Sequence, residues 1–187
     1  MATQKELVAI VSERLGVPLE TVTVLDRFLA EAGLRTRALR GRGSTPMTYR
    51  DAANLIIATA LDSAPKNVVH LVSAYGSLKA YRVMEIDIDA AAFGQTFGES
   101  LAKLIDTVAV YEDDFSAHDE ASNHAEAEVT LRGPTPHAQI SLIRGGRSTT
   151  FEYGGIYGEK NDLRRAIQFT QVTLGFVGKA IAKDLPR

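Results

Sequence analysis

Apolar residues in the first third of the chain recur at helical spacing and predict two short amphipathic helices. Thr3 and Glu6 match the T-x-x-E capping box that opens a helix, and Gly16 provides a stop. Pro18 suits the first turn of a second helix, which Gly33 ends. Two short helices joined by a tight turn have the layout of a helix-turn-helix. Their apolar stripes are Leu7, Ile10, Val11 and Leu15, then Val22, Leu25, Leu29 and Ala32.

A basic, glycine-rich segment follows the second helix. Residues 34–39 alternate apolar and basic side chains, as an exposed strand does, and residues 40–44 supply turn residues. Residues 45–49 are then expected to return as a second strand at the edge. The two strands together would form a wing. Thr48 predicts the N-cap of a third helix over residues 49–61.

The middle of the chain changes from helical to alternating periodicity and back. A helix is predicted over residues 66–78, and a half-exposed strand over residues 79–89, where apolar and polar positions alternate. Residues 90–112 again show a helical stripe. Residues 113–123 are polar and acidic and predict a loop.

The last third predicts three strands and a final helix. The strands are expected at residues 124–132, 137–144 and 148–153, with Gly- and Pro-rich connections typical of hairpins. After a Gly-rich loop, a helix is expected over residues 162–183.

These elements define the class as α+β. We expect a winged helix-turn-helix over residues 1–62, then an α+β domain over residues 63–187 with an antiparallel meander of about four strands and two long helices. In the last helix, Gly175 and Gly178 would allow close approach of another backbone. Its wide apolar circumference indicates either the centre of the core or a dimer interface.

Motifs within the first 62 residues resemble winged helix-turn-helix DNA-binding domains. They are Leu15-Gly16-Val17, Thr21-Val22 and Leu29-Ala30-Glu31-Ala32-Gly33-Leu34, followed by the basic Gly-rich turn. In that family such a segment spans the recognition helix and leads into the wing. Residues 40–56 are also similar to small proteins of bacterial prophages. The resemblance implies a DNA-binding protein of phage or prophage type.

Charge is distributed in blocks that fit this interpretation. From Arg27 to Arg50 there are six arginines and one acid, in a chain of net charge -2. Residues 1–50 carry net +3, residues 85–128 net -11 and residues 129–187 net +5. A local basic strip in an acidic protein is typical of a phosphate-binding surface, whereas the acidic block indicates a solvated face or a second working surface.

The resemblance implies specific DNA contacts. The second helix would enter the major groove with its outward side chains, and the wing would contact phosphates or the minor groove. The candidate residues are Glu20, Thr21, Thr23, Val24 and Arg27 on the helix, and Arg35, Arg37, Arg40, Arg42 and Arg50 after it. The acids Glu20, Asp26 and Glu31 weaken the positive field of the helix.

Other chemistry has weaker signals. The only grouping that suggests a metal is His118, Asp119, Glu120 and His124, whose spacing matches no strong motif. The loop Gly154-Gly155-Ile156-Tyr157-Gly158 follows a strand and precedes a helix, but it lacks the Lys-Ser/Thr of a P-loop. No nucleophile has a recognisable base. We therefore expect no enzyme, no cofactor and no metal.

The bulk composition favours a cytoplasmic protein. At 187 residues and 45% hydrophobic, the chain can bury one good core or two small ones. It has no cysteine, so disulfides are excluded. An apolar leader or an 18-residue apolar run is absent from the sequence, and we expect no membrane partner.

Three functional hypotheses follow. The first is a transcriptional regulator that binds double-stranded DNA as a homodimer, because one short reading helix rarely provides enough site length alone. The second is a phage DNA-packaging recognition subunit, which would assemble as a ring. The third is a protein-interaction module or inhibitor of a host or phage protein, in which the acidic surface of residues 85–128 imitates nucleic acid or docks on a basic partner.

Overall fold

The computed structural model describes residues 2–37, 45–84, 94–110, 125–144, 147–155 and 165–182. The chain begins with four helices, α1 (Gln4–Leu15), α2 (Leu19–Glu31), α3 (Tyr49–Ala60) and α4 (Pro65–Gly76). Strand β1 (Ala80–Met84) and helix α5 (Phe97–Val110) follow. The remaining elements are β2 (Ala125–Gly133), β3 (His137–Arg144), β4 (Arg147–Tyr153), β5 (Arg165–Thr170) and α7 (Gln171–Ala182).

Local sequence signals set the ends of the first helices. Thr3 and Glu6 form the predicted capping box at the start of α1, and Gly16 ends this helix in the left-handed conformation at φ 66°. Thr48 and Asp51 form a second capping box at the start of α3. Each box satisfies amides that have no partner within the helix. The predicted first, second, third and fourth helices are confirmed.

The wing is not confirmed. Residues 34–37 and 45–48 form no strand, because their backbone amides bond elsewhere. The Leu34 amide donates to the Leu29 carbonyl at 2.9 Å, and the Met47 amide donates to the Ala2 carbonyl at 3.0 Å. The expected turn at residues 38–44 lies outside the described residues. The described residues therefore show two helices, α1 and α2, joined by a short turn, and a winged helix-turn-helix stays a prediction.

The sheet is five-stranded and antiparallel, with the order β1-β4-β3-β2-β5. The predicted meander β2-β3-β4 is confirmed, and β1 adds to its β4 edge. On the helix-facing side, Val129 of β2 is opposite Ile140 of β3, which is opposite Phe151 of β4. All three are buried. Alternation along these strands thus places one apolar face against the helices.

Two predicted helices begin later than expected. Residues 165–170 form β5 and not the first turns of the last helix, because Ile167 and Phe169 pair with Leu131 and Val129 of β2. Burying these two side chains on the sheet outweighs continuing the helix. Helix α5 begins at Phe97; residues 94–96 are not helical, and residues 85–93 lie outside the described part of the chain.

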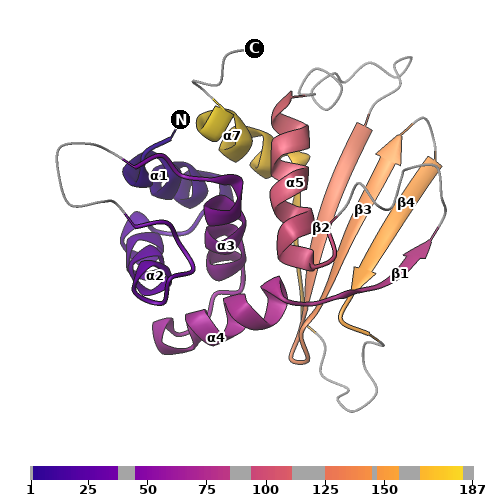
Figure 1. The fold of residues 1–187 in the computed structure, drawn as a ribbon, viewed down its shortest axis with the longest axis horizontal. Helices are drawn as coiled ribbons and strands as arrows, with labels where there is room; N and C mark the ends of the chain where they lie inside the picture. The colour runs from indigo at the N-terminus through magenta and orange to yellow at the C-terminus, as the bar shows by residue number, and fades with distance from the viewer. Residues whose placement is uncertain are drawn as a thin grey trace.

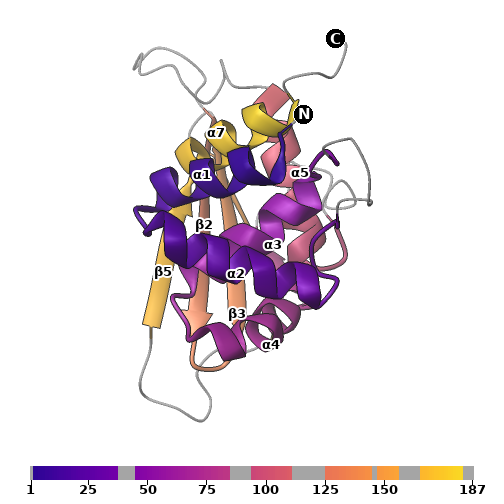
Figure 2. The ribbon, with the colours of Figure 1, turned by 90° about the vertical axis from the view of Figure 1, so that its left-hand side faces the viewer.

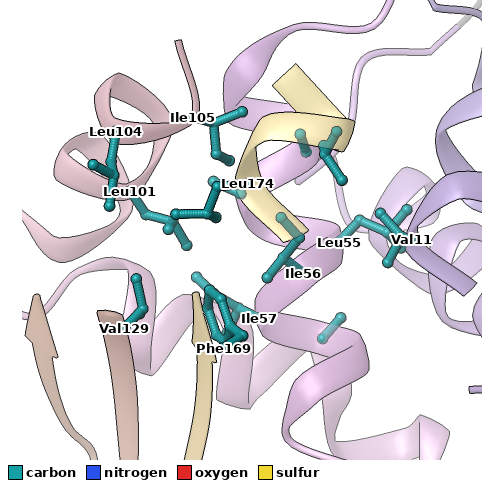
Figure 3. Packing of buried hydrophobic residues seen from close by; sticks show 14 of the residues in the cluster. Val11, Leu55, Ile56, Ile57, Leu101, Leu104, Ile105, Val129, Phe169 and Leu174 are labelled. Carbon is teal, nitrogen blue, oxygen red and sulfur yellow. The ribbon is translucent and has the colours of Figure 1, made fainter. Parts of the chain in front are cut away.

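The core lies between the sheet and two layers of helices. Figure 1 shows α5 and α7 against one face of the sheet, with α1, α2 and α3 beyond them, and Figure 2 shows the same layers from the helical side. In Figure 3, Val11 of α1, Leu55 of α3, Leu174 of α7 and Val129 of β2 belong to one hydrophobic cluster. A domain boundary at residue 62 stays a prediction, although buried residues on both sides of it share this cluster.

Helices α5 and α7 approach closely at the predicted glycine. A Cβ atom added to Gly178 would lie 2.5 Å from the Ile105 carbonyl oxygen and 2.7 Å from Ala109 Cβ. The close-approach prediction is thereby confirmed for Gly178. Much of α7 is buried, which agrees with the core interpretation of its apolar circumference, while Val172 (56%) and Phe176 (44%) stay exposed.

Candidate nucleic-acid interface on the second helix

Helix α2 presents a polar outer face. It buries Val22, Leu25 and Leu29 against α1, α3 and α4, so that the opposite side of the helix faces solvent, as Figure 2 shows. Four of the predicted base-reading residues are exposed there, and the fifth is half-buried. The exposed ones are Glu20, Thr21, Thr23 and Arg27, and the half-buried one is Val24.

Arg35 forms a buried ion pair and does not point freely into solvent. Its Nε lies 2.7 Å from Asp26 Oδ1, with side-chain exposures of 13% for Arg35 and 2% for Asp26. Gln4 Nε2 donates to Asp26 Oδ2 at 2.9 Å. Burial raises the pKa of Asp26, although the hydrogen bond from Gln4 and the Arg35 charge pull it down. The pair therefore joins the residues after α2 to the inner side of that helix.

Arg37 caps the end of α2. Its Nε donates to the Ala30 carbonyl at 2.6 Å and its Nη2 to the Glu31 carbonyl at 2.7 Å. A cation at a helix C-terminus satisfies carbonyls without an intrahelical partner and complements the helix dipole. Arg37 remains exposed, so its guanidinium is both a cap and a surface charge.

A backbone hydrogen bond fixes the segment between these arginines. The Thr36 amide donates to Asp51 Oδ1 at 2.7 Å, while Asp51 Oδ2 accepts from the Thr48 amide at 2.8 Å. Asp51 is itself buried. One carboxylate thus caps α3 and holds the residue that lies between Arg35 and Arg37.

These contacts bring four predicted DNA-binding residues to one hollow. Thr23, Arg27, Arg35 and Arg37 border an open hollow of about 550 Å³ on the surface of α2. Among the described residues, its lining is Gln4, Thr23, Asp26, Arg27, Ala30, Glu31, Arg35 and Arg37. The sign of its charge is mixed, because Glu31 lies 3.9 Å from Arg27 in an exposed pair. Such an exposed pair is weak and leaves Arg27 available to another anion.

Arg50 lies elsewhere. A Cβ atom placed on Gly98 in the first turn of α5 would be 2.9 Å from Arg50 Nη1, and one placed on Gly76 would be 3.9 Å from Arg50 Nη2. The Arg50 guanidinium therefore covers the end of α4 and the start of α5, and Arg50 does not line the α2 hollow. Arg40 and Arg42 lie outside the described residues.

The weaker candidate sites remain without support. His118, Asp119, Glu120 and His124 lie outside the described residues, and within those residues no group of three His, Cys, Asp or Glu side chains could hold a metal. In the Gly-rich loop, the Gly154 amide donates to the Lys79 carbonyl at 3.0 Å, so this amide is occupied within the protein. Residues 156–158 of that loop are not described.

Sequence reasoning missed the role of Asp26. It treated this acid as a residue that weakens the field of the helix, whereas the side chain is buried beside Arg35. A signal was present, since Asp26 is four residues after Val22 and three before Leu29, on the apolar stripe of α2. An acid within such a stripe predicts a buried partner.

Comparisons with protein-family models, with curated proteins and with solved structures found no match to this chain. Among the described helices, none has the length and apolar character needed to cross a membrane.

Proposed function

We propose that this protein binds double-stranded DNA through the outer face of α2 and the arginines that follow it, and acts as a homodimeric transcriptional regulator of phage type. The supporting observation is that Thr23, Arg27 and Arg37 border one hollow on an outward-facing helix. Side chains of this kind, grouped on one helix and on the residues that follow it, suit base-edge and phosphate contacts in a major groove.

The arginines make different contacts in the structure, so this proposal gives them different roles. Arg27 is 66% exposed and pairs only loosely with Glu31, so it is the principal phosphate or base contact on α2. Arg37 adds an exposed charge at the helix end. Arg35 positions the chain through Asp26 and makes no DNA contact, because a phosphate would have to replace a buried partner. Arg40 and Arg42 follow directly in the sequence and extend the basic surface.

The test is binding of a fluorescent mixed-sequence duplex across a salt series. Each phosphate contact contributes about -0.9 to the slope of log affinity against log salt concentration. Arg27→Gln should reduce the magnitude of the slope by about one such step, and Arg40→Ala/Arg42→Ala by about two. Arg82→Gln is the matched control, since Arg82 is exposed on β1 at the far side of the molecule (Figure 1).

Absence of duplex binding by the wild-type protein at low salt would refute the proposal. Equal losses in Arg27→Gln and Arg82→Gln would locate any binding away from α2. Analytical ultracentrifugation then separates a dimeric regulator from a ring-forming packaging subunit, because the two differ in the number of subunits.

A further inference from the structure

A second hollow lies between the start of β5, the end of β2 and helix α4. Its volume is about 400 Å³, within the range of small-molecule sites in proteins. The loop between α3 and α4 borders one side, and the end of β2 and the start of β5 border the other. None of the described residues that line it borders the α2 hollow.

The walls of this hollow are largely apolar. Leu71 of α4, Leu131 of β2 and Ile167 of β5 line it. Leu131 and Ile167 are register partners on neighbouring strands, so their side chains lie together on the helix-facing side of the sheet. An apolar group entering from solvent would be covered from both the sheet and the helix.

Three polar side chains line the same hollow without a partner in the described residues. The Asp62 carboxylate and the Arg165 guanidinium belong to exposed residues, and each lacks an ion pair or a side-chain hydrogen bond to another described residue. The Ser63 hydroxyl oxygen is buried and has no hydrogen bond. A buried hydroxyl without a partner is costly, and such groups are normally satisfied by protein atoms, by ordered water or by a ligand.

The backbone at Asp62 is left-handed and places this residue at the turn between α3 and α4. Asp62 has φ 42°, the only positive value among non-glycine residues in the described part of the chain. Asp62 directly follows Leu61, the C-cap residue of α3, where a left-handed residue commonly ends a helix, and aspartate tolerates this conformation better than most residues. The conformation follows the end of α3 and sets the course of the chain into Ser63 and α4.

We propose that this hollow binds a small zwitterion with an apolar side chain, of the class of a free hydrophobic amino acid. Arg165 and the Ser63 hydroxyl would receive the carboxylate, Asp62 would pair with the ammonium group, and Leu71, Leu131 and Ile167 would cover the side chain. A purely anionic ligand would pair with Arg165 but leave Asp62 without a partner, and a purely cationic ligand would pair with Asp62 but leave Arg165 without one. The proposal does not depend on DNA binding.

The experiment measures changes in the amide NMR signals of the full chain on addition of L-leucine or L-phenylalanine at millimolar concentration. Three truncated analogues are the comparison: 4-methylpentanoate lacks the ammonium group, 3-methylbutylamine lacks the carboxylate, and glycine lacks the side chain. We expect saturable shifts around Ser63, Gly133 and Arg165 with one of the amino acids, and binding at least about tenfold weaker with each analogue, as loss of one contact of about 1.4 kcal/mol predicts.

Ser63→Ala, Asp62→Asn and Arg165→Gln should each weaken binding by about tenfold or more. Ser63→Ala removes a hydroxyl that has no partner, so folding should be retained, and asparagine keeps the backbone conformation available at position 62. Lys66→Gln is the charge-matched control, because Lys66 is exposed and does not line the hollow. The proposal is overturned if neither amino acid produces a shift. It is also overturned if 4-methylpentanoate binds as tightly as the amino acid, or if the three variants bind the amino acid as tightly as the wild type does.

Discussion

Arg35 Nε lies 2.7 Å from Asp26 Oδ1, and both side chains are largely withdrawn from solvent. This pair connects the last turns of α2 to the residues that follow it. It also removes one arginine from the set available to bind phosphate. A count of arginines in the sequence therefore overstates the positive charge that a DNA backbone would meet at this surface.

Arg35→Gln should destabilise the protein by about 3 kcal/mol at neutral pH, because it leaves the Asp26 carboxylate buried without its cation. Urea unfolding measures the change. Arg37→Gln is the comparison, since Arg37 is exposed and loses only its cap of α2, at a cost of about 1 kcal/mol. Similar losses in both variants would mean that the ion pair contributes little.

Asp26 should make stability depend on pH. Its pKa is raised above the ordinary value of 3.8, with burial as the main cause. The native state therefore holds this proton more tightly than the unfolded chain does. The resulting contribution to the free energy of unfolding is fully present below pH 3.8 and is lost as the pH rises through the native pKa. Asp26→Asn should remove this decline from the pH profile of unfolding free energy. Glu20→Gln, which changes the same charge on the exposed face, should keep it.

His137 should make stability depend on pH in the opposite direction. Burial, followed by the Arg132 charge, lowers its pKa from 6.5, while Glu152 raises it by less. The neutral ring is thus favoured in the native state. Its contribution to the free energy of unfolding is fully present above the unfolded-state pKa and is lost as the pH falls through the native-state pKa. Unfolding in urea between about pH 7.5 and pH 5 should show a loss of stability that His137→Gln flattens. His70→Gln, at an exposed position on α4, should retain the loss.

Gly178→Ala should destabilise the fold by about 2 kcal/mol, because the new methyl group would overlap the backbone of α5. Gly175→Ala is a matched control in the same helix. There the nearest atom to an added Cβ is Val108 Cγ1 at 3.4 Å, and alanine favours a helix over glycine by up to about 1 kcal/mol. We expect Gly175→Ala to be neutral or stabilising in thermal unfolding. If Gly175→Ala destabilised the protein more than Gly178→Ala, the prediction that the close contact lies at Gly178 would be wrong.

Elements with local signals could be predicted from the sequence. Thr3 with Glu6 and Thr48 with its helix specify their own caps, and the alternation in β2, β3 and β4 identifies a half-buried sheet. Strand β5 could not be separated from α7, because Ile167 and Phe169 run directly into the apolar helix. Their partners on β2 are about 40 residues away in the sequence, where no local pattern reveals them.

The predicted wing and candidate site show the same limit. Alternation in residues 34–39 is typical of a strand, yet the Thr36 amide bonds to Asp51, a side chain 15 residues away. The sequence identifies the arginines and the helix that carries Thr23 and Arg27. It does not reveal which arginine is paired, since that depends on the packing of α1, α2 and α3 around Asp26.

The packing of α1 against α7 has a consequence for biosynthesis. Arg14 of α1 lies over the ring of Phe176 at 3.5 Å from its centroid, so an early helix finds its partner in the last helix described (Figure 1). Because synthesis proceeds from the N-terminus, the nascent chain must keep α1 without this cover until residues near 176 have left the ribosome. Contacts of such long sequence separation slow folding. The emergence of residues near 176, more than formation of any single helix, would then time the completion of this contact.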